Sequence, residues 1–176
     1  VDSLVLQPAG YGAAYGRGLG GLLQLSSAVI SPGVHGEVGA DFLDASALFS
    51  ASLGSRVGIA LSGRWGYVDR LLPALTSQPL ADFYPLPQYW DTQGRIVVTL
   101  RDSSGLSEEL SARVIGSGDS RTRMQTIPDV ASAQTETFVR TFWRVAMDYV
   151  RKQPDQEVHV TPWLGLDDER WSALFG

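Results

Sequence analysis

The chain contains no cysteine among its 176 residues, which excludes disulfides, thiolate metal sites and cysteine nucleophiles together. Long apolar runs are missing as well. The longest stretches are short, such as residues 96–98 and 145–147, whereas a membrane-spanning helix needs about 18 apolar residues. Any membrane residence must therefore come from strands, whose alternating apolar residues keep the mean hydropathy near zero. Its value here is -0.02.

Charged residues are also scarce, at 19% of the chain against about 25% in typical soluble domains. The net charge of -5, from 14 basic and 19 acidic residues, argues against a general nucleic-acid surface. The first residues lack the basic and apolar segments of a signal peptide, so we expect any export signal to lie outside this sequence. The 19 glycines, nine prolines and 10% aromatic residues suit strands and turns.

Residues 56–68 give the cleanest period-two alternation in the chain. One face carries Val57, Ile59, Leu61, Trp65 and Tyr67, and the other carries Arg56, Gly58, Ala60, Ser62, Arg64 and Gly66. The length slightly exceeds the 9–11 residues that a tilted strand needs to cross a bilayer. The two aromatic residues lie together at one end, where the interfacial girdle of a barrel would place them.

Six further segments are predicted as strands by the same pattern. They are residues 35–42, 44–53, 93–101, 109–117, 137–151 and 157–166, preceded by a short strand at residues 21–27. Short turns are expected at residues 43–44, 54–55, 102–105 and 154–155, and long loops at residues 70–87 and 118–136, with another loop beginning at residue 167. After the first tip the connections alternate between short and long, as in outer-membrane barrels.

The competing interpretation is a soluble β-sandwich binding module, such as a lectin-like domain, since sandwiches alternate too. Three features favour a barrel: strands of 13 to 15 residues against a mode of about 5–6, charges on the non-apolar face, and the alternating loops. We therefore predict an all-β antiparallel meander of about seven strands, forming part of a transmembrane barrel. The apolar residues predicted to face outward are Val57, Ile59, Leu61, Val139, Val145 and Met147.

One stretch is specific enough to suggest a family. Tyr15-Gly16-Arg17-Gly18-Leu19-Gly20-Gly21 and the short apolar strand after it resemble the end of the plug domain in TonB-dependent outer-membrane receptors. The order of later motifs is also similar: His35-Gly36-Glu37-Val38, then Ser52-Leu53-Gly54 without the family's proline, then Ala60-Leu61-Ser62-Gly63-Arg64. The similarity covers about residues 8–67. Tyr89-Trp90-Asp91 and Gly116-Ser117-Gly118-Asp119 look like receptor-like proteins of myxobacteria.

The resemblance implies a domain division, a location and a set of partners. Residues 1–33 would be the end of a plug and its linker, and residues 34–176 the first strands of an incomplete barrel, since such barrels have about 22 strands. The junction residues would be Tyr15, Gly16, Arg17, Gly18, Gly20 and Gly21. Expected partners are outer-membrane lipid, the remaining plug and barrel strands, and the TonB complex through a segment absent here.

The implied function is uptake of a small ligand, such as an iron chelate, cobalamin or a glycan, across the bacterial outer membrane. A receptor-like barrel with an envelope-machinery or adhesive role would have the same sequence features.

No catalytic, metal or cofactor site is predicted. Residues 16–21 match G-x-G-x-x-G, but a strand-like segment follows where a dinucleotide site needs a helix. His35 and His159 have no second ligand at metal spacing. Asp41 and Asp44 flank a predicted turn, where aspartate is common. We therefore expect the protein not to be an enzyme.

The predicted ligand-binding residues come from one aromatic cluster and one arginine. Phe83, Tyr84, Tyr89 and Trp90 end the first long loop and could stack on a sugar or an aromatic chelate, or simply form an interfacial belt. Arginines on the polar face could guide an anionic ligand, or could pair with acids of the plug or of neighbouring strands; these are Arg64, Arg140 and Arg144. The predicted ligand-binding residues are therefore the four aromatic residues and Arg64.

Overall fold

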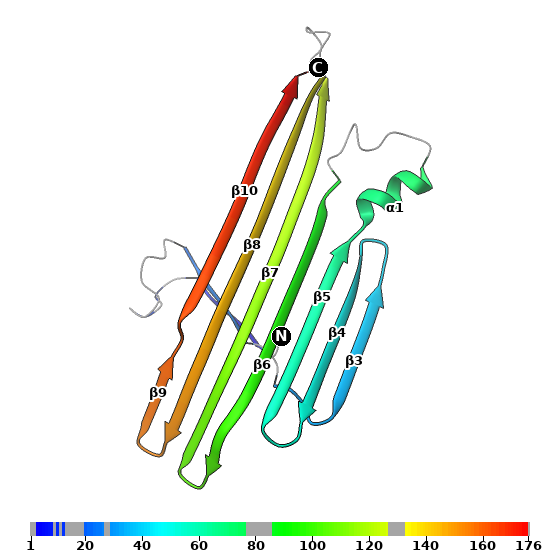
Figure 1. The fold of residues 1–176 in the computed structure, drawn as a ribbon. Helices are drawn as coiled ribbons and strands as arrows, with labels where there is room; N and C mark the ends of the chain where they lie inside the picture. The colour runs from blue at the N-terminus through cyan, green and yellow to red at the C-terminus, as the bar shows by residue number, and fades with distance from the viewer. Residues whose placement is uncertain are drawn as a thin grey trace.

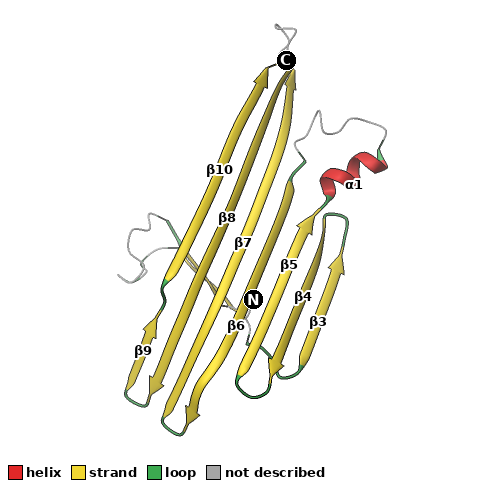
Figure 2. Cartoon of the chain, viewed as in Figure 1, coloured by secondary structure: helices red, strands yellow, loops and turns green. Residues whose placement is uncertain are grey.

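A computed structural model describes residues 3–8, 10, 12, 20–26, 29–76, 86–126 and 133–175. Most of them lie in antiparallel β-strands, so the all-β prediction is confirmed (Figure 2). The strands are β1 (Ser3–Gln7), β2 (Leu22–Ser26), β3 (Val34–Ala40), β4 (Asp44–Leu53), β5 (Val57–Gly66), β6 (Gln88–Ser103), β7 (Leu106–Thr126), β8 (Ala133–Gln153), β9 (Gln156–Val160) and β10 (Trp163–Phe175). One helix, α1 (Val68–Leu75), follows β5.

The main sheet is a meander in which each strand from β3 to β8 pairs with the next one along the chain (Figure 1). The order is β3-β4-β5-β6-β7-β8-β10, and β9 pairs with β8 in line with β10, which makes eight strands. β1 and β2 form a separate two-stranded sheet that the sequence analysis predicted only in its second strand. The predicted antiparallel meander is therefore confirmed.

The connections at one end of the sheet are tight (Figure 1). Residues 54–56, 104–105 and 154–155 join consecutive strands there. Gly54 and Gly105 have φ values of 69° and 94°, which glycine adopts without the steric cost that other residues meet. At the opposite end lie the tip at residues 41–43 and the segment that contains α1. The short turns predicted at residues 54–55, 102–105 and 154–155 are confirmed, and the tip predicted at residues 43–44 lies at residues 41–43.

Two predicted loops are wrong because strands continue through them. The loop predicted at residues 118–136 is mostly ladder, since β7 extends to Thr126 and β8 begins at Ala133. The loop predicted from residue 167 is the body of β10, which reaches Phe175. In these parts neither face is uniformly apolar, so hydrophobic alternation gives no signal. The backbone hydrogen bonds of the ladder hold the strands together instead.

Helix α1 occupies the start of the loop predicted at residues 70–87. The backbone N–H groups of Arg70 and Leu71 donate to the carbonyl of Tyr67 at 3.0 and 2.9 Å. Val68 is buried, which anchors the first turn. Pro73 lies inside the helix, where proline removes a backbone hydrogen-bond donor. Because of this proline the sequence predicted a loop rather than a helix. Residues 77–85 lie outside the described part of the chain.

The register divides the sheet into two faces, because directly paired residues of antiparallel strands point to the same side. We call one side the apolar face; its members include Phe49, Ala51, Leu53, Val57, Ile59, Leu61, Trp65, Trp90, Ile96, Val98, Leu110, Ala112, Val114, Trp143, Val145, Met147, Leu164 and Leu166. The other is the polar face, with Ser46, Arg64, Asp91, Arg95, Arg113, Arg144, Asp148 and Asp167 among its members.

The apolar face is not covered by the described residues. Leu61, Val145 and Met147 are 53%, 46% and 48% exposed, and Val57, Ile59 and Val139 are half-buried. No large side chain in the described part is fully buried. Among the described residues the main sheet therefore has no second layer over its apolar face.

No helix among the described residues combines the length and the apolar character needed to cross a membrane.

One bulge interrupts the alternation of side chains in β6. Strict alternation would place Arg101 on the face of Arg95 and Thr99. The register instead shifts between Thr99 and Arg101, so that Arg101 lies opposite Glu108. Such a bulge adds one residue to one strand and exchanges the faces beyond it. Arg101 therefore joins the end of the apolar face.

Candidate functional site

A row of charged residues closes the apolar face at the end with the tight turns. Glu108 on β7 lies between two arginines, with its carboxylate oxygens 3.6 Å from Nε of Arg101 and 3.6 Å from Nε of Arg151. The hydroxyl of Tyr149 donates to the same carboxylate at 3.3 Å. At this end of the sheet the apolar residues are thus followed directly by charged residues.

Polar residues close the opposite end of the apolar face. Ser120 on β7 pairs with Gln88, and in the next row the hydroxyls of Thr122 and Thr137 are 3.3 Å apart. Between these limits the residues of β7 on the apolar face are all apolar or glycine, from Leu110 to Gly118. These eight steps span about 26 Å along the strand at about 3.3 Å per residue. A transmembrane barrel carries an apolar band about 25 Å tall. Because the strands of a barrel are tilted, each strand covers a height somewhat smaller than its own length.

Tryptophans gather near the upper limit of the apolar face. The rings of Trp90 and Trp143 lie 5.5 Å apart and tilted by 45°, and Trp65 is paired with Trp90. Glycines opposite the rings make room for them. A Cβ atom at Gly116 would lie 2.5 Å from Trp143, and one at Gly118 would lie 2.5 Å from Trp90.

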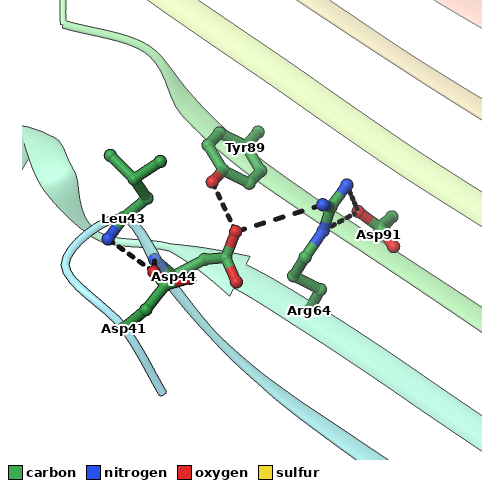
Figure 3. A network of polar contacts seen from close by, with 6 residues as sticks. All are labelled: Asp41, Leu43, Asp44, Arg64, Tyr89 and Asp91. Atoms are coloured by element: carbon green, nitrogen blue, oxygen red, sulfur yellow. Dashed lines mark hydrogen bonds and ion pairs between the residues drawn. The ribbon is translucent and has the colours of Figure 1, made fainter. Parts of the chain in front are cut away.

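A polar cluster joins β4, β5 and β6 on the other face (Figure 3). The guanidinium of Arg64 donates to Asp91 through Nε and Nη2, each 2.8 Å from Oδ2. Its Nη1 atom is 4.0 Å from Oδ2 of Asp44, and the hydroxyl of Tyr89 donates to the same oxygen at 2.7 Å. Gly66 gives the tyrosine ring its space, because a Cβ there would lie 2.6 Å from it.

The tip between β3 and β4 positions Asp44 in this cluster. Oδ1 of Asp41 accepts the backbone N–H groups of Leu43 and Asp44 at 2.7 and 2.9 Å, as an Asx turn does (Figure 3). These two bonds hold the pKa of the Asp41 carboxyl below its ordinary value. The hydroxyl of Tyr67 donates to the Asp41 carbonyl. Asp41 is thus a turn former, whereas Asp44 contacts side chains of β5 and β6.

The structure brings together only two of the predicted ligand-binding residues. Arg64 and Tyr89 meet on the polar face, with the guanidinium carbon 5.4 Å from the ring centroid. Trp90 lies on the apolar face, because adjacent strand residues point to opposite sides. The predicted aromatic cluster is therefore split between two surfaces. Phe83 and Tyr84 lie outside the described residues.

A second polar cluster ties β7 and β8 to the break between β9 and β10. Asp148 is only 8% exposed, and its carboxylate lies 2.6 Å from Nη2 of Arg113. It also accepts a bond of 2.8 Å from the hydroxyl of Thr161 and lies 3.6 Å from Nε2 of His159. Its oxygens are thus already engaged. Among the described residues no three His, Asp or Glu side chains are arranged to hold a metal ion.

A third group, which we call the aromatic wall, lies on the polar face towards the far ends of β7, β8 and β10. It consists of Phe138, Phe142, Trp171, Arg121, Arg140 and Arg144. The guanidinium carbons of Arg121 and Arg144 lie 5.3 Å from the ring centroids of Phe138 and Phe142 respectively. Arg144 also binds both carboxylate oxygens of Asp167 at 2.8 Å.

The aromatic wall was not predicted from the sequence. Trp171 fell in a predicted loop, and the alternation of residues 137–151 was judged by its apolar side alone. Phe138 and Phe142 occupy the positions that alternate with that side, next to the arginines. Large aromatic residues on the charged side of a strand were the available signal. The acid on a neighbouring strand expected for Arg64 and Arg144 is observed in both cases.

The segment before β3 approaches the polar face. A Cβ at Gly58, which shares the face of Arg64, would lie 3.0 Å from Cδ1 of Ile30. Gly21 instead lies close to β1, where a Cβ would be 3.2 Å from the carbonyl oxygen of Gln7. A Cβ at Gly20 would meet no atom within 4 Å. The other predicted junction residues, Tyr15, Gly16, Arg17 and Gly18, lie outside the described part of the chain.

Comparisons with models of protein families, with curated proteins and with solved structures find no match for this chain. The two faces of the sheet and their boundaries are therefore the features from which a function must follow.

Proposed function

We propose that this chain forms part of the wall of an outer-membrane β-barrel of the TonB-dependent type, and that the complete barrel takes up a ligand. Residues 1–33 would then be the end of the plug. One observation carries the proposal: a continuous apolar face, left open by the described residues and limited by charged and polar rows. The separation of those rows suits the hydrocarbon core of a bilayer.

An apolar surface of this extent needs a permanent cover. Burying apolar area is worth roughly 25 cal/mol per Å², and apolar patches beyond a few hundred Å² mark interaction sites. Lipid chains cover a flat sheet face without requiring a complementary shape. The ion pairs around Glu108 at one limit and the tryptophans at the other suit the two headgroup regions, where charged and aromatic side chains are favourable.

The polar face has the character expected of a barrel interior. Its charges are paired across neighbouring strands, as in Arg64–Asp91 and Arg113–Asp148. Contact between Ile30 and Gly58 brings the segment before β3 onto this face, which is the side on which a plug would lie. The short turns gathered at one end agree with periplasmic turns.

A soluble sandwich is less well supported. It would need a second sheet of comparable size against one face of the first. Among the described residues the other sheet comprises β1 and β2, with five residues each, whereas β7 and β8 have 21 each. So small a sheet cannot cover the apolar face.

The absence of cysteine from these 176 residues allows a direct test with single spin labels in isolated outer membranes that contain the full-length protein, once any cysteine elsewhere in it has been replaced by serine. Leu61→Cys and Val145→Cys place labels on the apolar face, and their neighbours Ser62→Cys and Ala146→Cys provide matched controls on the polar face. We expect oxygen, which concentrates in lipid, to relax the first pair, and a water-soluble nickel chelate to relax the second. Equal access of the nickel chelate to all four labels would rule out the membrane wall.

Uptake is tested separately. Cells with and without the protein are supplied with a labelled ferric chelate, cobalamin or a neutral oligosaccharide. We expect protein-dependent accumulation of one of them, and its loss when the inner-membrane proton gradient is collapsed. A lipid-facing barrel that accumulates none of these would have an adhesive or envelope role instead.

A further inference from the structure

Two aromatic side chains of the aromatic wall lie where lipid does not account for them. Trp171 on β10 is 66% exposed and is directly paired with Phe138 on β8. The adjacent row on the opposite face contains Thr137 and Ser172, so this part of the sheet has passed the end of the apolar face. Large aromatic residues exposed on a charged surface, away from the lipid-facing side, are typical of ligand contacts.

The charges of the aromatic wall are balanced. Arg140 lies between Asp119 and Glu169 in the register, and Arg144 is held by both oxygens of Asp167. With Arg121, three arginines face three carboxylates. The wall therefore has no net positive potential with which to attract an anionic chelate.

Its aromatic rings are held in place before any ligand arrives. Arg121 and Arg144 stack on Phe138 and Phe142 with guanidinium-to-centroid distances of 5.3 Å. Such cation–π contacts fix the rings, which lowers the ordering cost of binding. Trp171, which is 66% exposed, is left as the open platform.

We infer that the aromatic wall binds a neutral oligosaccharide. A pyranose ring offers an apolar C–H face and a rim of hydroxyls that donate and accept. The indole of Trp171 matches the apolar C–H face. The row of Asp119, Arg140 and Glu169, which lies between the rows of Phe138 and Phe142, supplies acceptors and donors for the hydroxyls. This inference rests on the proposed function, in which the wall lines the external mouth of the barrel, and it selects a sugar over a charged chelate.

The test uses full-length protein in detergent and isothermal titration calorimetry. The probes are neutral oligosaccharides of glucose, mannose, galactose and xylose, with a ferric tris-catecholate as the anionic probe. We expect at least one oligosaccharide to bind, Trp171→Ala to weaken it by about tenfold or more, and Trp171→Phe to restore part of the affinity. Trp163→Ala is the matched control, since Trp163 is on the same strand and face and is 70% exposed. It should change affinity by less than about twofold.

Three outcomes would overturn the inference: no oligosaccharide binds at millimolar concentration, Trp171→Ala binds as well as the parent, or the ferric chelate binds and Arg140→Ala abolishes this. Retained β-sheet circular dichroism shows that a variant is folded. The spin-label result stands apart from these measurements. If the label at Leu61 faces lipid but no sugar binds, only the inferred ligand class is wrong. If the label at Leu61 is in water, the proposed barrel is wrong as well.

Discussion

Arg64 and Tyr89 face each other on the polar side of the sheet, 5.4 Å from guanidinium carbon to ring centroid, and both reach the carboxylate of Asp44. Asp44 opens β4, Arg64 is near the end of β5, and Tyr89 is near the start of β6. One carboxylate therefore links three consecutive strands beside the first hairpin tip.

Removing that carboxylate should loosen this corner of the sheet. In Asp44→Ala the half-buried hydroxyl of Tyr89 loses its acceptor, and we expect the free energy of unfolding to fall by about 1–2 kcal/mol. Urea unfolding of the protein in lipid vesicles measures it.

The double-mutant cycle with Tyr89→Phe provides the control. The phenylalanine variant has no hydroxyl left to satisfy, so adding Asp44→Ala to it should cost less than Asp44→Ala alone. Strictly additive effects would mean that the bond of 2.7 Å between the two side chains contributes nothing.

Asp148 should matter more, since it is nearly buried. Asp148→Ala leaves Arg113 without its acid and Thr161 without its acceptor, and we expect a loss of about 2–3 kcal/mol in the free energy of unfolding. Thr161→Val removes one hydrogen bond only and should cost about 1 kcal/mol. Equal losses in the two variants would contradict a network centred on the carboxylate.

Glycine at position 116 is predicted to be a packing requirement. A Cβ there would lie 2.5 Å from the Trp143 ring, which itself packs against Trp90, so Gly116→Ala should force the ring aside at a cost of about 1–3 kcal/mol. The matched control is Gly36→Ala in β3, where the nearest atom would be 3.8 Å away. Thermal unfolding should distinguish them, and a Gly116→Ala variant as stable as Gly36→Ala would show that the ring has room to move.

The orientation of the sheet gives a prediction about intact cells. Arg123→Cys is at the end of the sheet with α1, and Asp155→Cys is in a tight turn at the opposite end. We expect a membrane-impermeant maleimide to label the first in whole cells and the second only after disruption, because the tight turns face the periplasm. The reverse labelling pattern would mean that the barrel has the opposite orientation in the membrane, with the tight turns outside the cell.

Much of the sheet was predictable because one face alternates strongly. The segment that became β5 and the turn at Gly105 follow from apolar periodicity and turn chemistry. The ends of β7 and β8 were missed because they lie beyond the apolar face, where pairing alone holds them. The bulge at residues 99–101 was missed because a shift of register leaves no mark in a single sequence. Helix α1 was hidden by Pro73.

The polar clusters were harder to predict than the strands. Arg64 and Tyr89 were both candidates, but their meeting depends on the register between β5 and β6, which places Arg64 opposite Asp91. The same parity sends Trp90 to the other surface. The partners of Asp148 come from β7, from β9 and from the break before β10, and nothing in their spacing along the chain brings them together.

Pro162 interrupts the outermost strand, yet its missing N–H faces inward. Its carbonyl accepts the N–H of Met147 at 3.0 Å, so Pro162 occupies a position whose backbone groups point at β8. The donors and acceptors that point the other way belong to the odd-numbered residues on either side of it. The proline therefore removes a donor from the side that faces β8 and none from the other side, so it does not itself prevent a further strand from pairing with β9 and β10.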